Sequence, residues 1–232
     1  MTQGDPAPEL VLLGASGLAR EVLAVVRETG SHRPVGVLDD SERAQGGAVS
    51  GVAVLGRIAD IPRFAHAEVI VCIGSGTARE RVVDSVLAAV SVAGGRGIRF
   101  ATIVDPSVRN PGDCPIGAGS IVLAHVSVTA DAVIGEHVVL MPNVTVTHDD
   151  VLEDYATLAS GVSLGGGVRV GRGAYLGMNC SVLPSLAIGD RAVVGMAAAV
   201  LTDVPGDETW VGVPARSITT RHPSYATVEA AL

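Results

Sequence analysis

The sequence predicts an α/β N-terminal domain of Rossmann-like type, followed by a left-handed parallel β-helix built from hexapeptide repeats. Of the 232 residues 48% are hydrophobic but only 3% aromatic, so small aliphatic side chains have to form the core. The first part alternates short apolar runs with helical patterns, and the second repeats an aliphatic residue at every sixth position. We place the domains at residues 1–103 and 104–216, with a tail at 217–232.

The elements of the N-terminal domain follow from its hydrophobic pattern. Strands are expected at Glu9–Leu13, Pro34–Leu38, Val52–Leu55, Glu68–Ile73 and Ile98–Ile103, and helices at Leu18–Thr29 and Thr77–Val92. This alternation is typical of parallel strands that are joined by crossover helices.

Two glycine-rich turns make this domain a candidate for nucleotide binding. The first follows the strand Glu9–Leu13 and opens a helix, where glycines let the backbone approach a phosphate. Carboxylates at the end of the second strand are suited to a ribose or sugar hydroxyl. The candidate substrate-binding residues are Gly14, Ala15, Ser16, Gly17, Asp39, Asp40 and, in the second glycine turn, Gly74. The pattern is not a full GxGxxG, which disfavours NAD, and a tight turn that binds nothing is the alternative.

A six-residue period dominates the second half of the chain. Fifteen consecutive hexads, from Ile116 to Val200, begin with a branched aliphatic residue. Such a period is typical of a parallel β-helix, in which three hexads close a triangular coil and residues eighteen apart stack. The fifth position is small or Val, apart from Asp150 and Leu186.

The fourth position of each hexad is expected at a corner of the coil. Gly, Asn and Asp recur there, and these residues tolerate left-handed backbone. His125 and His137 also lie in these columns, and we expect both at the surface. Hexads that contain His125, His137 and His148 lie on three different sides, so no metal site is expected within one chain.

The composition restricts the other classes of function. A net charge of -8 and the lack of a basic run argue against binding to nucleic acid. No apolar stretch is long enough for a membrane helix, and the start does not resemble a signal peptide, so we expect a soluble, cytoplasmic protein. Cys72, Cys114 and Cys180 form no CxxC pair and are expected to be reduced, mostly buried thiols.

His148 is the candidate reactive side chain of the β-helix. It occupies the third position of its hexad with Asp149 beside it, and Gly166 lies one coil further in the same column. We expect the glycine to leave space for a ligand above the imidazole. Asp150 stands where a small apolar residue is expected, a departure of the kind seen at functional sites. A solvated polar turn is the alternative.

The sequence resembles the hexapeptide-repeat acyltransferases, and among them the sialic acid and bacillosamine type of sugar O/N-acetyltransferases, which carry a nucleotide-sugar-binding domain in front of the β-helix. Four segments carry the resemblance: GASGLAREV at 14–22, LDD at 38–40, THDDVLEDYATLASGVSLGGGVRVG at 147–171, and GVPAR at 212–216.

The resemblance implies an acetyl-CoA-dependent N-acetyltransferase that acts on the amino group of a nucleotide-linked amino sugar. It makes His148 the general base and Asp149 the residue that raises its basicity. It also implies a homotrimer with acetyl-CoA in the grooves between subunits. Candidate contacts with acetyl-CoA are Thr157, Gly166, Met178, Gly195 and Arg216.

Two departures and two alternatives accompany this interpretation. Leu18 and Thr157 stand where members of the family have histidines, which affects the expected contacts with the sugar and with acetyl-CoA. O-acetylation of sialic acid or of another sugar hydroxyl is an alternative reaction. A non-catalytic β-helix that binds a partner is the alternative from another class.

Overall fold

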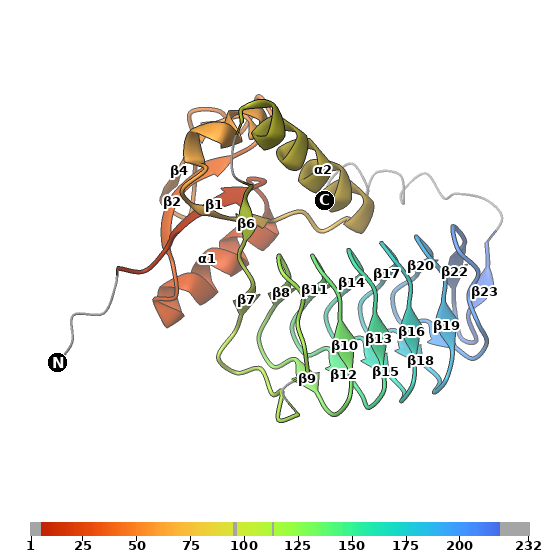
Figure 1. Ribbon diagram of the computed structural model, residues 1–232. Helices are drawn as coiled ribbons and strands as arrows, with labels where there is room; N and C mark the ends of the chain where they lie inside the picture. Colours follow the sequence, from red (N-terminus) through yellow and green to blue (C-terminus); the bar gives the residue numbers. More distant parts are fainter. Residues whose placement is uncertain (1–5, 95–96, 113, 219–232) are drawn as a thin grey trace. The chain divides into compact units, whose positions relative to one another are not determined.

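The computed structural model describes residues 6–94, 97–112 and 114–218, and the chain divides into two compact units (Figure 1). The first unit comprises Met1–Ile73 and Arg81–Ala101, and the second comprises Gly74–Glu80 and Thr102–Leu232. The short segment Gly74–Glu80, which we expected in the N-terminal domain, thus belongs with the β-helix. Most of the predicted tail, from residue 219 on, lies outside the described residues.

The first unit contains a six-stranded sheet in the order β3-β4-β2-β1-β5-β6. Its strands are β1 (Glu9–Leu13), β2 (Arg33–Leu38), β3 (Ala48–Val49), β4 (Val52–Gly56), β5 (Glu68–Val71) and β6 (Arg99–Phe100). All neighbours are parallel except β3 and β4. The helices are α1 (Gly17–Thr29) and α2 (Gly76–Val92), and a 3-10 helix spans Ile58–Phe64. This order of strands and helices confirms the α/β fold class.

Three details of this unit differ from the expectation. The two-residue strand β3 and the 3-10 helix, which contains Pro62, are too short to give a periodic signal. The strand expected at Ile98–Ile103 is interrupted after Phe100, and Ile103–Val104 form the separate strand β7 in a sheet of the second unit.

Helix α1 begins and ends as its sequence predicts. The Ser16 side chain accepts a hydrogen bond from the Ala19 N–H at the N-cap, and Gly30 ends the helix with a φ of 63°. Leu18 lies on the buried face of the helix, so it packs in the core of the unit.

The second unit is a parallel β-helix with three sheets. Strands β7, β8, β11, β14, β17, β20, β22 and β23 form one sheet, β9, β12, β15, β18 and β21 the second, and β10, β13, β16 and β19 the third. Up to β21, partners lie eighteen residues apart, as in the pairing of Val139 with both Ile121 and Thr157. This register confirms that three hexads make one coil. The last two strands depart from this spacing, and β23 is antiparallel to β22.

Strands β7 to β21 of the second unit each begin one residue before the aliphatic position of the six-residue register, whereas β22 and β23 follow the last hexad. They are Ile103–Val104 (β7), Ile121–Val122 (β8), Ser127–Val128 (β9), Val133–Ile134 (β10), Val139–Leu140 (β11), Thr145–Val146 (β12), Val151–Leu152 (β13), Thr157–Leu158 (β14), Ser163–Leu164 (β15), Arg169–Val170 (β16), Tyr175–Leu176 (β17), Ser181–Val182 (β18), Ala187–Ile188 (β19), Val193–Val194 (β20), Ala199–Val200 (β21), Thr209–Val211 (β22) and Arg216–Ser217 (β23).

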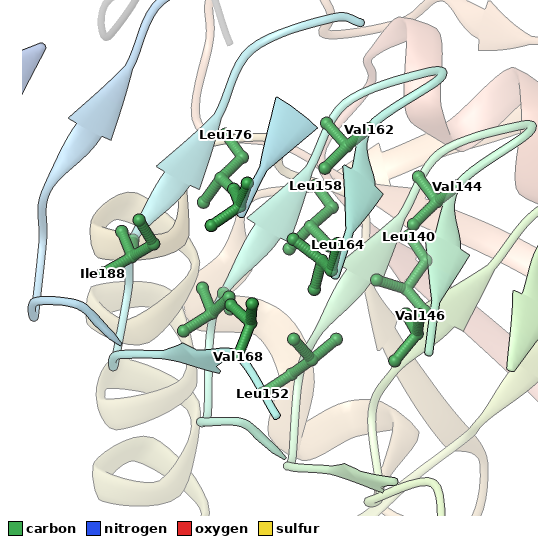
Figure 2. Packing of buried hydrophobic residues seen from close by; sticks show 14 of the residues in the cluster. Leu140, Val144, Val146, Leu152, Leu158, Val162, Leu164, Val168, Leu176 and Ile188 are labelled. Carbon is green, nitrogen blue, oxygen red and sulfur yellow. The ribbon is translucent and has the colours of Figure 1, made fainter. Parts of the chain in front are cut away.

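The core of the β-helix consists of aliphatic side chains that stack from coil to coil (Figure 2). Residues at the first hexad position, such as Leu140, Leu158 and Leu176, are fully buried. Residues at the fifth position, such as Val144 and Val162, fill the space beside them. Burial of each such side chain stabilises the fold by about 1.5–3 kcal/mol.

The corners also follow the prediction. Every fourth-position residue from Gly119 to Ala197 has a φ between 54° and 75°, whether or not it is glycine. Asp203, in the last hexad, does not have a positive φ; its carboxylate accepts a hydrogen bond from the Ala187 N–H at 2.8 Å. The expected buried state of the three cysteines is confirmed, and all three are free thiols.

His137 corrects one of our expectations. His125 is exposed as predicted, but His137 is 2% exposed, and its ring stacks on Tyr155 with a centroid distance of 5.1 Å. The segment Gly74–Glu80 covers this corner, and the Arg79 Nε donates a hydrogen bond to the His137 carbonyl at 2.7 Å. Burial and the charge of Arg79 lower the pKa of His137 to about 4.

Candidate active site

His148 lies in the turn that follows strand β12, with its side chain 67% exposed. Its Nδ1 is 2.7 Å from Asp149 Oδ2, and this hydrogen bond raises the pKa of His148. Asp149 has a φ of 62°, as the corner position predicts. Among the described residues no hydrogen-bond partner contacts Nε2. An imidazole whose Nδ1–H is held by a carboxylate can accept a proton at this second nitrogen.

Gly166 lies against the ring of His148, one coil further along. A Cβ atom on Gly166 would overlap Cε1 and Nε2 of His148. The space that we expected for a ligand above the imidazole is therefore filled by the imidazole itself. The Gly167 N–H donates a hydrogen bond to the His148 carbonyl at 2.9 Å, so the two turns are also joined through the backbone.

Asp150 is fully buried beneath the same turn, although its neighbours His148 and Asp149 are exposed. Its carboxylate accepts hydrogen bonds from the backbone N–H groups of Thr147 at 2.6 Å and Val168 at 2.8 Å. Burial raises the pKa of Asp150, while these hydrogen bonds and the nearby His148 oppose the shift. Asp150 therefore departs from the hexad pattern because its carboxylate accepts hydrogen bonds from the backbone of two turns.

Thr157 and Gly74 lie together within the second unit. Thr157 is 3% exposed; its hydroxyl donates to the Gly74 carbonyl at 2.9 Å and accepts a hydrogen bond from Arg79 Nη2 at 3.0 Å. Arg79 is fully buried and also donates to the Gly74 carbonyl at 3.2 Å. Thr157 would have to leave these partners to contact a cofactor. Gly74 belongs to the β-helix unit and not, as expected, to the N-terminal domain that holds the first glycine turn.

The other expected contacts of acetyl-CoA lie in later parts of the β-helix. Met178 is 47% exposed at the turn after strand β17. Gly195 is buried after β20, where a Cβ would lie 2.7 Å from Val211 Cγ1. Arg216 is exposed and donates a hydrogen bond to the Ala215 carbonyl at 2.7 Å. Their role as cofactor contacts stays a prediction.

The first glycine turn is built as a close approach between strands β1 and β5. Gly14 has a φ of 103°, and a Cβ there would lie 3.0 Å from the Cys72 carbonyl oxygen. Ser16 donates its hydroxyl hydrogen to the same carbonyl at 2.7 Å. The Ala15 N–H donates to Asp39 Oδ2 at 2.6 Å, so the second strand and the turn are tied together.

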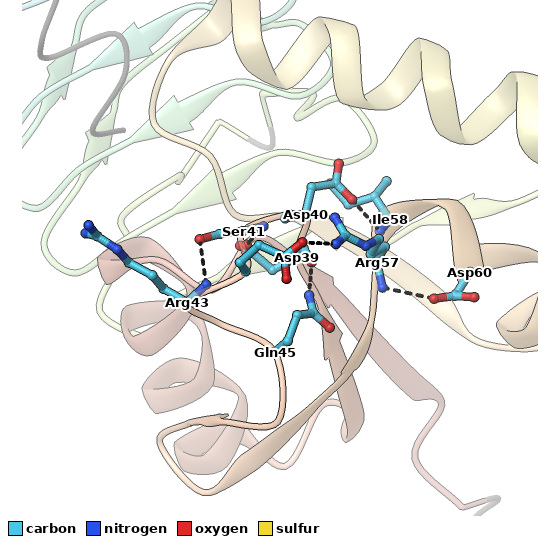
Figure 3. Close-up of polar contacts among 9 residues, drawn as sticks. Asp39, Asp40, Ser41, Arg43, Gln45, Arg57, Ile58 and Asp60 are labelled. Carbon is cyan, nitrogen blue, oxygen red and sulfur yellow. Dashed lines mark hydrogen bonds and ion pairs between the residues drawn. The ribbon is translucent and has the colours of Figure 1, made fainter.

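The two aspartates after β2 hold loops of the protein itself (Figure 3). Asp39 Oδ1 accepts a hydrogen bond from the Ser41 N–H at 2.7 Å, in addition to the bond from Ala15. Asp40 Oδ1 accepts from the Ile58 N–H at 3.0 Å. Both carboxylates therefore position the loops around the turn, a role that the sequence pattern alone did not reveal.

A pocket of about 350 Å³ opens beside the glycine turn of the first unit. It is lined by Ala15, Arg20, Asp39, Ser41, Arg43, Ala44, Gly47, Ala48, Val49, Ser50 and Val54. Ala15 and Asp39 were predicted as site residues, whereas Arg20 and Arg43 were not. Two exposed guanidinium groups beside a helix N-terminus favour a ligand that carries phosphates. Arg20 could have been predicted as a site residue from the sequence, because it lies in the first turn of the helix that follows the glycine turn.

No helix in the part of the chain that the structure describes has the length and apolarity needed to cross a membrane. Within the same residues, no three His, Cys, Asp or Glu side chains come together as ligands for a metal ion.

Comparison with protein families and solved structures points to one group of enzymes. Residues 9–86 match the PglD N-terminal domain family. No match was found among curated proteins. A histidine-to-asparagine variant of perosamine N-acetyltransferase from Caulobacter crescentus, solved with CoA and GDP-perosamine, is 26% identical; the alignment covers 91% of this chain and 97% of that one, with a TM-score of 0.82.

Two other solved structures extend this likeness. WeeI from Acinetobacter baumannii AYE is 26% identical with a TM-score of 0.78, and 90% of this chain and 99% of that chain are covered. The acetyltransferase domain of PglB from Neisseria gonorrhoeae FA1090 shares the fold at 24% identity, with a TM-score of 0.80 and coverage of 91% and 100%. The expected resemblance and fold class are thereby confirmed.

Proposed function

We propose that this chain, a hexapeptide-repeat acyltransferase with a PglD-type N-terminal domain, is an acetyl-CoA-dependent N-acetyltransferase of a nucleotide-linked amino sugar. The similarity along nearly the whole chain to an N-acetyltransferase solved with CoA and GDP-perosamine supports the enzyme class, the co-substrate and the class of acceptor. The exposed pair of His148 and Asp149 is the observation in this chain that carries the proposal.

His148 acts in this proposal as the general base. The amine nitrogen of the sugar forms a bond to the acetyl carbonyl carbon, and the carbon–sulfur bond of the thioester breaks. Nε2 of His148 takes the amine proton and passes it to the departing thiolate. Asp149 holds the Nδ1–H, which fixes the ring and favours its protonated form during the transfer. Positioned bases of this kind contribute about 10²- to 10⁴-fold to the rate.

The pocket of the first unit is the proposed binding site for the nucleotide. Arg20 and Arg43 supply positive charge for the phosphates, and Asp39 holds the loop that forms one wall. The exposed residues Met178 and Arg216 remain our candidates for contact with acetyl-CoA in a homotrimer. Light scattering on the purified protein tests the trimer, because a monomer would remove the grooves between subunits.

A substrate panel tests the proposed reaction directly. The protein is incubated with acetyl-CoA and UDP-, GDP- and dTDP-linked amino sugars, and release of the CoA thiol is measured. We expect turnover with one class of nucleotide amino sugar and none with the matching sugar that carries a hydroxyl in place of the amine. Turnover of the hydroxyl sugar alone would indicate O-acetylation, and neither turnover nor a thermal shift with any ligand would indicate a binding module.

A further inference from the structure

Most turns of the β-helix use backbone hydrogen bonds in a repeated way. The N–H at the second hexad position donates to the coil that follows, as in Thr129 to the Val146 carbonyl at 3.1 Å and Gly165 to the Val182 carbonyl at 2.9 Å. The N–H at the fifth position often closes its own turn, as in Ala174 to the Gly171 carbonyl at 3.1 Å. Successive coils are therefore joined through the same backbone donor and acceptor positions.

The turn that carries His148 departs from the first rule, and the turn one coil further departs from the second. The Thr147 N–H donates to Asp150 Oδ2, and the Thr147 hydroxyl donates to the Leu164 carbonyl at 3.2 Å in place of the backbone. The Val168 N–H donates to Asp150 Oδ1 of the preceding coil. Strands β12 and β15 accordingly pair only through Thr145 and Ser163, whereas β15 and β18 pair through two residues each.

One buried carboxylate therefore joins two turns. The first turn, Thr147–Asp150, presents the imidazole of His148, and the second, 165–168, contains Gly166, against which the ring lies. Each carboxylate oxygen accepts from one turn. An aliphatic side chain at position 150 would leave the Thr147 and Val168 N–H groups without these acceptors, so the two turns would have to rearrange.

We propose that Asp150 is a positioning residue of the acetyltransferase, which fixes the orientation of the His148 ring by tying its turn to the turn of Gly166. The proposal rests on the proposed function, in which His148 is the base. Because Asp150 is fully buried, it acts through the backbone of two neighbouring coils.

The chain contains a matched control for this side-chain link between two coils. Ser120 also occupies a fifth hexad position and is fully buried; its hydroxyl accepts from the Val138 N–H at 3.0 Å and donates to the Gly135 carbonyl at 3.0 Å. It therefore joins two coils with a side chain, as Asp150 does, but in turns that do not contain His148. Substitution of either side chain removes a link between two coils. Only substitution of Asp150 should change the orientation of the His148 ring.

The test compares Asp150→Asn and Asp150→Ser with Ser120→Ala and His148→Ala in the full chain. Asparagine keeps the shape but turns an amide donor toward one of the two N–H groups, and serine supplies the single acceptor that Ser120 uses. We expect kcat to fall about 10- to 100-fold in the Asp150 variants, with KM for both substrates within about threefold of the wild type. Ser120→Ala should keep kcat within about twofold.

A second measurement separates this proposal from the proposed function. The ring signals of His148 in NMR spectra, assigned with His148→Ala, should shift in the Asp150 variants and stay unchanged in Ser120→Ala. Wild-type kcat in a folded Asp150 variant, equal losses in Ser120→Ala, or unchanged ring signals would each overturn the positioning role. Inactive wild-type protein with shifted ring signals would overturn the function and leave the positioning role supported.

Discussion

His148 and His137 show how one scaffold gives two histidines opposite properties. Both rings lie where a glycine of a neighbouring coil leaves room, since a Cβ on Gly166 or on Gly119 would overlap them. His148 is open to solvent beside the carboxylate of Asp149, which raises its pKa. His137 is buried next to Arg79, and its pKa falls to about 4.

The difference shows that the β-helix provides the space for an imidazole ring, whereas the groups around the ring determine its pKa. A glycine in the stacking column admits an imidazole in either turn. Whether the ring can accept a proton near neutral pH depends on the charge and cover that other segments add. At His137 that cover comes from Gly74–Glu80, a segment distant in sequence.

The largest expected effect concerns His148. His148→Ala should lower kcat at least about 100-fold, because the positioned base is lost, while the oligomeric state and the thermal midpoint stay near those of the wild type. Steady-state kinetics and light scattering measure both. His125→Ala, at an exposed corner of an earlier coil, is the control and should keep full activity. Near-normal turnover of His148→Ala would end the assignment of the base.

The next effect should appear in stability at low pH, through His137. Its folded-state pKa of about 4 lies below the ordinary 6.5, so the unfolded chain binds the proton first as the pH falls. The free energy of unfolding should therefore decrease between pH 6.5 and pH 4, by up to about 3 kcal/mol from this group.

Denaturant unfolding at several pH values measures this contribution as the difference between wild type and His137→Gln. The variant removes the titrating ring and should show a smaller loss of stability over the same range. Identical pH slopes in the two proteins would mean that the His137 ring does not stay neutral in the folded state.

The smallest effect should be a shift in the pH dependence of activity. Asp149→Asn removes the carboxylate that raises the pKa of His148, so the acid limb of the kcat/KM profile should move to lower pH. The loss of rate at pH 7.5 should be about tenfold, less than for His148→Ala. A profile that coincides with the wild type would exclude Asp149 as the partner of the base.

The regular parts of the fold could be predicted residue by residue. A six-residue period places each side chain in one of a few repeated environments, so strand register, inward stacking and left-handed corners all followed from the sequence. The exposed pair of His148 and Asp149 followed from the same argument together with the family resemblance.

The remainder depended on contacts between segments that are far apart in the chain. The cover over His137 comes from Gly74–Glu80, and no periodicity indicates that packing. Asp39 binds the Ala15 N–H across 24 positions, so its role in holding the turn could not be separated from a role in ligand binding. The lining of the pocket by Arg43 likewise depends on how an irregular loop folds.

The three-hexad coil also limits how the length of this protein can change. Because strands pair with partners eighteen positions away, removal or duplication of eighteen residues leaves every later side chain on its original face. Gain or loss of one hexad would instead move all later residues to the neighbouring face of the prism. In lineages that descend from this chain, insertions within the column should therefore come in whole coils, and shorter ones should accumulate at the corners as bulging loops.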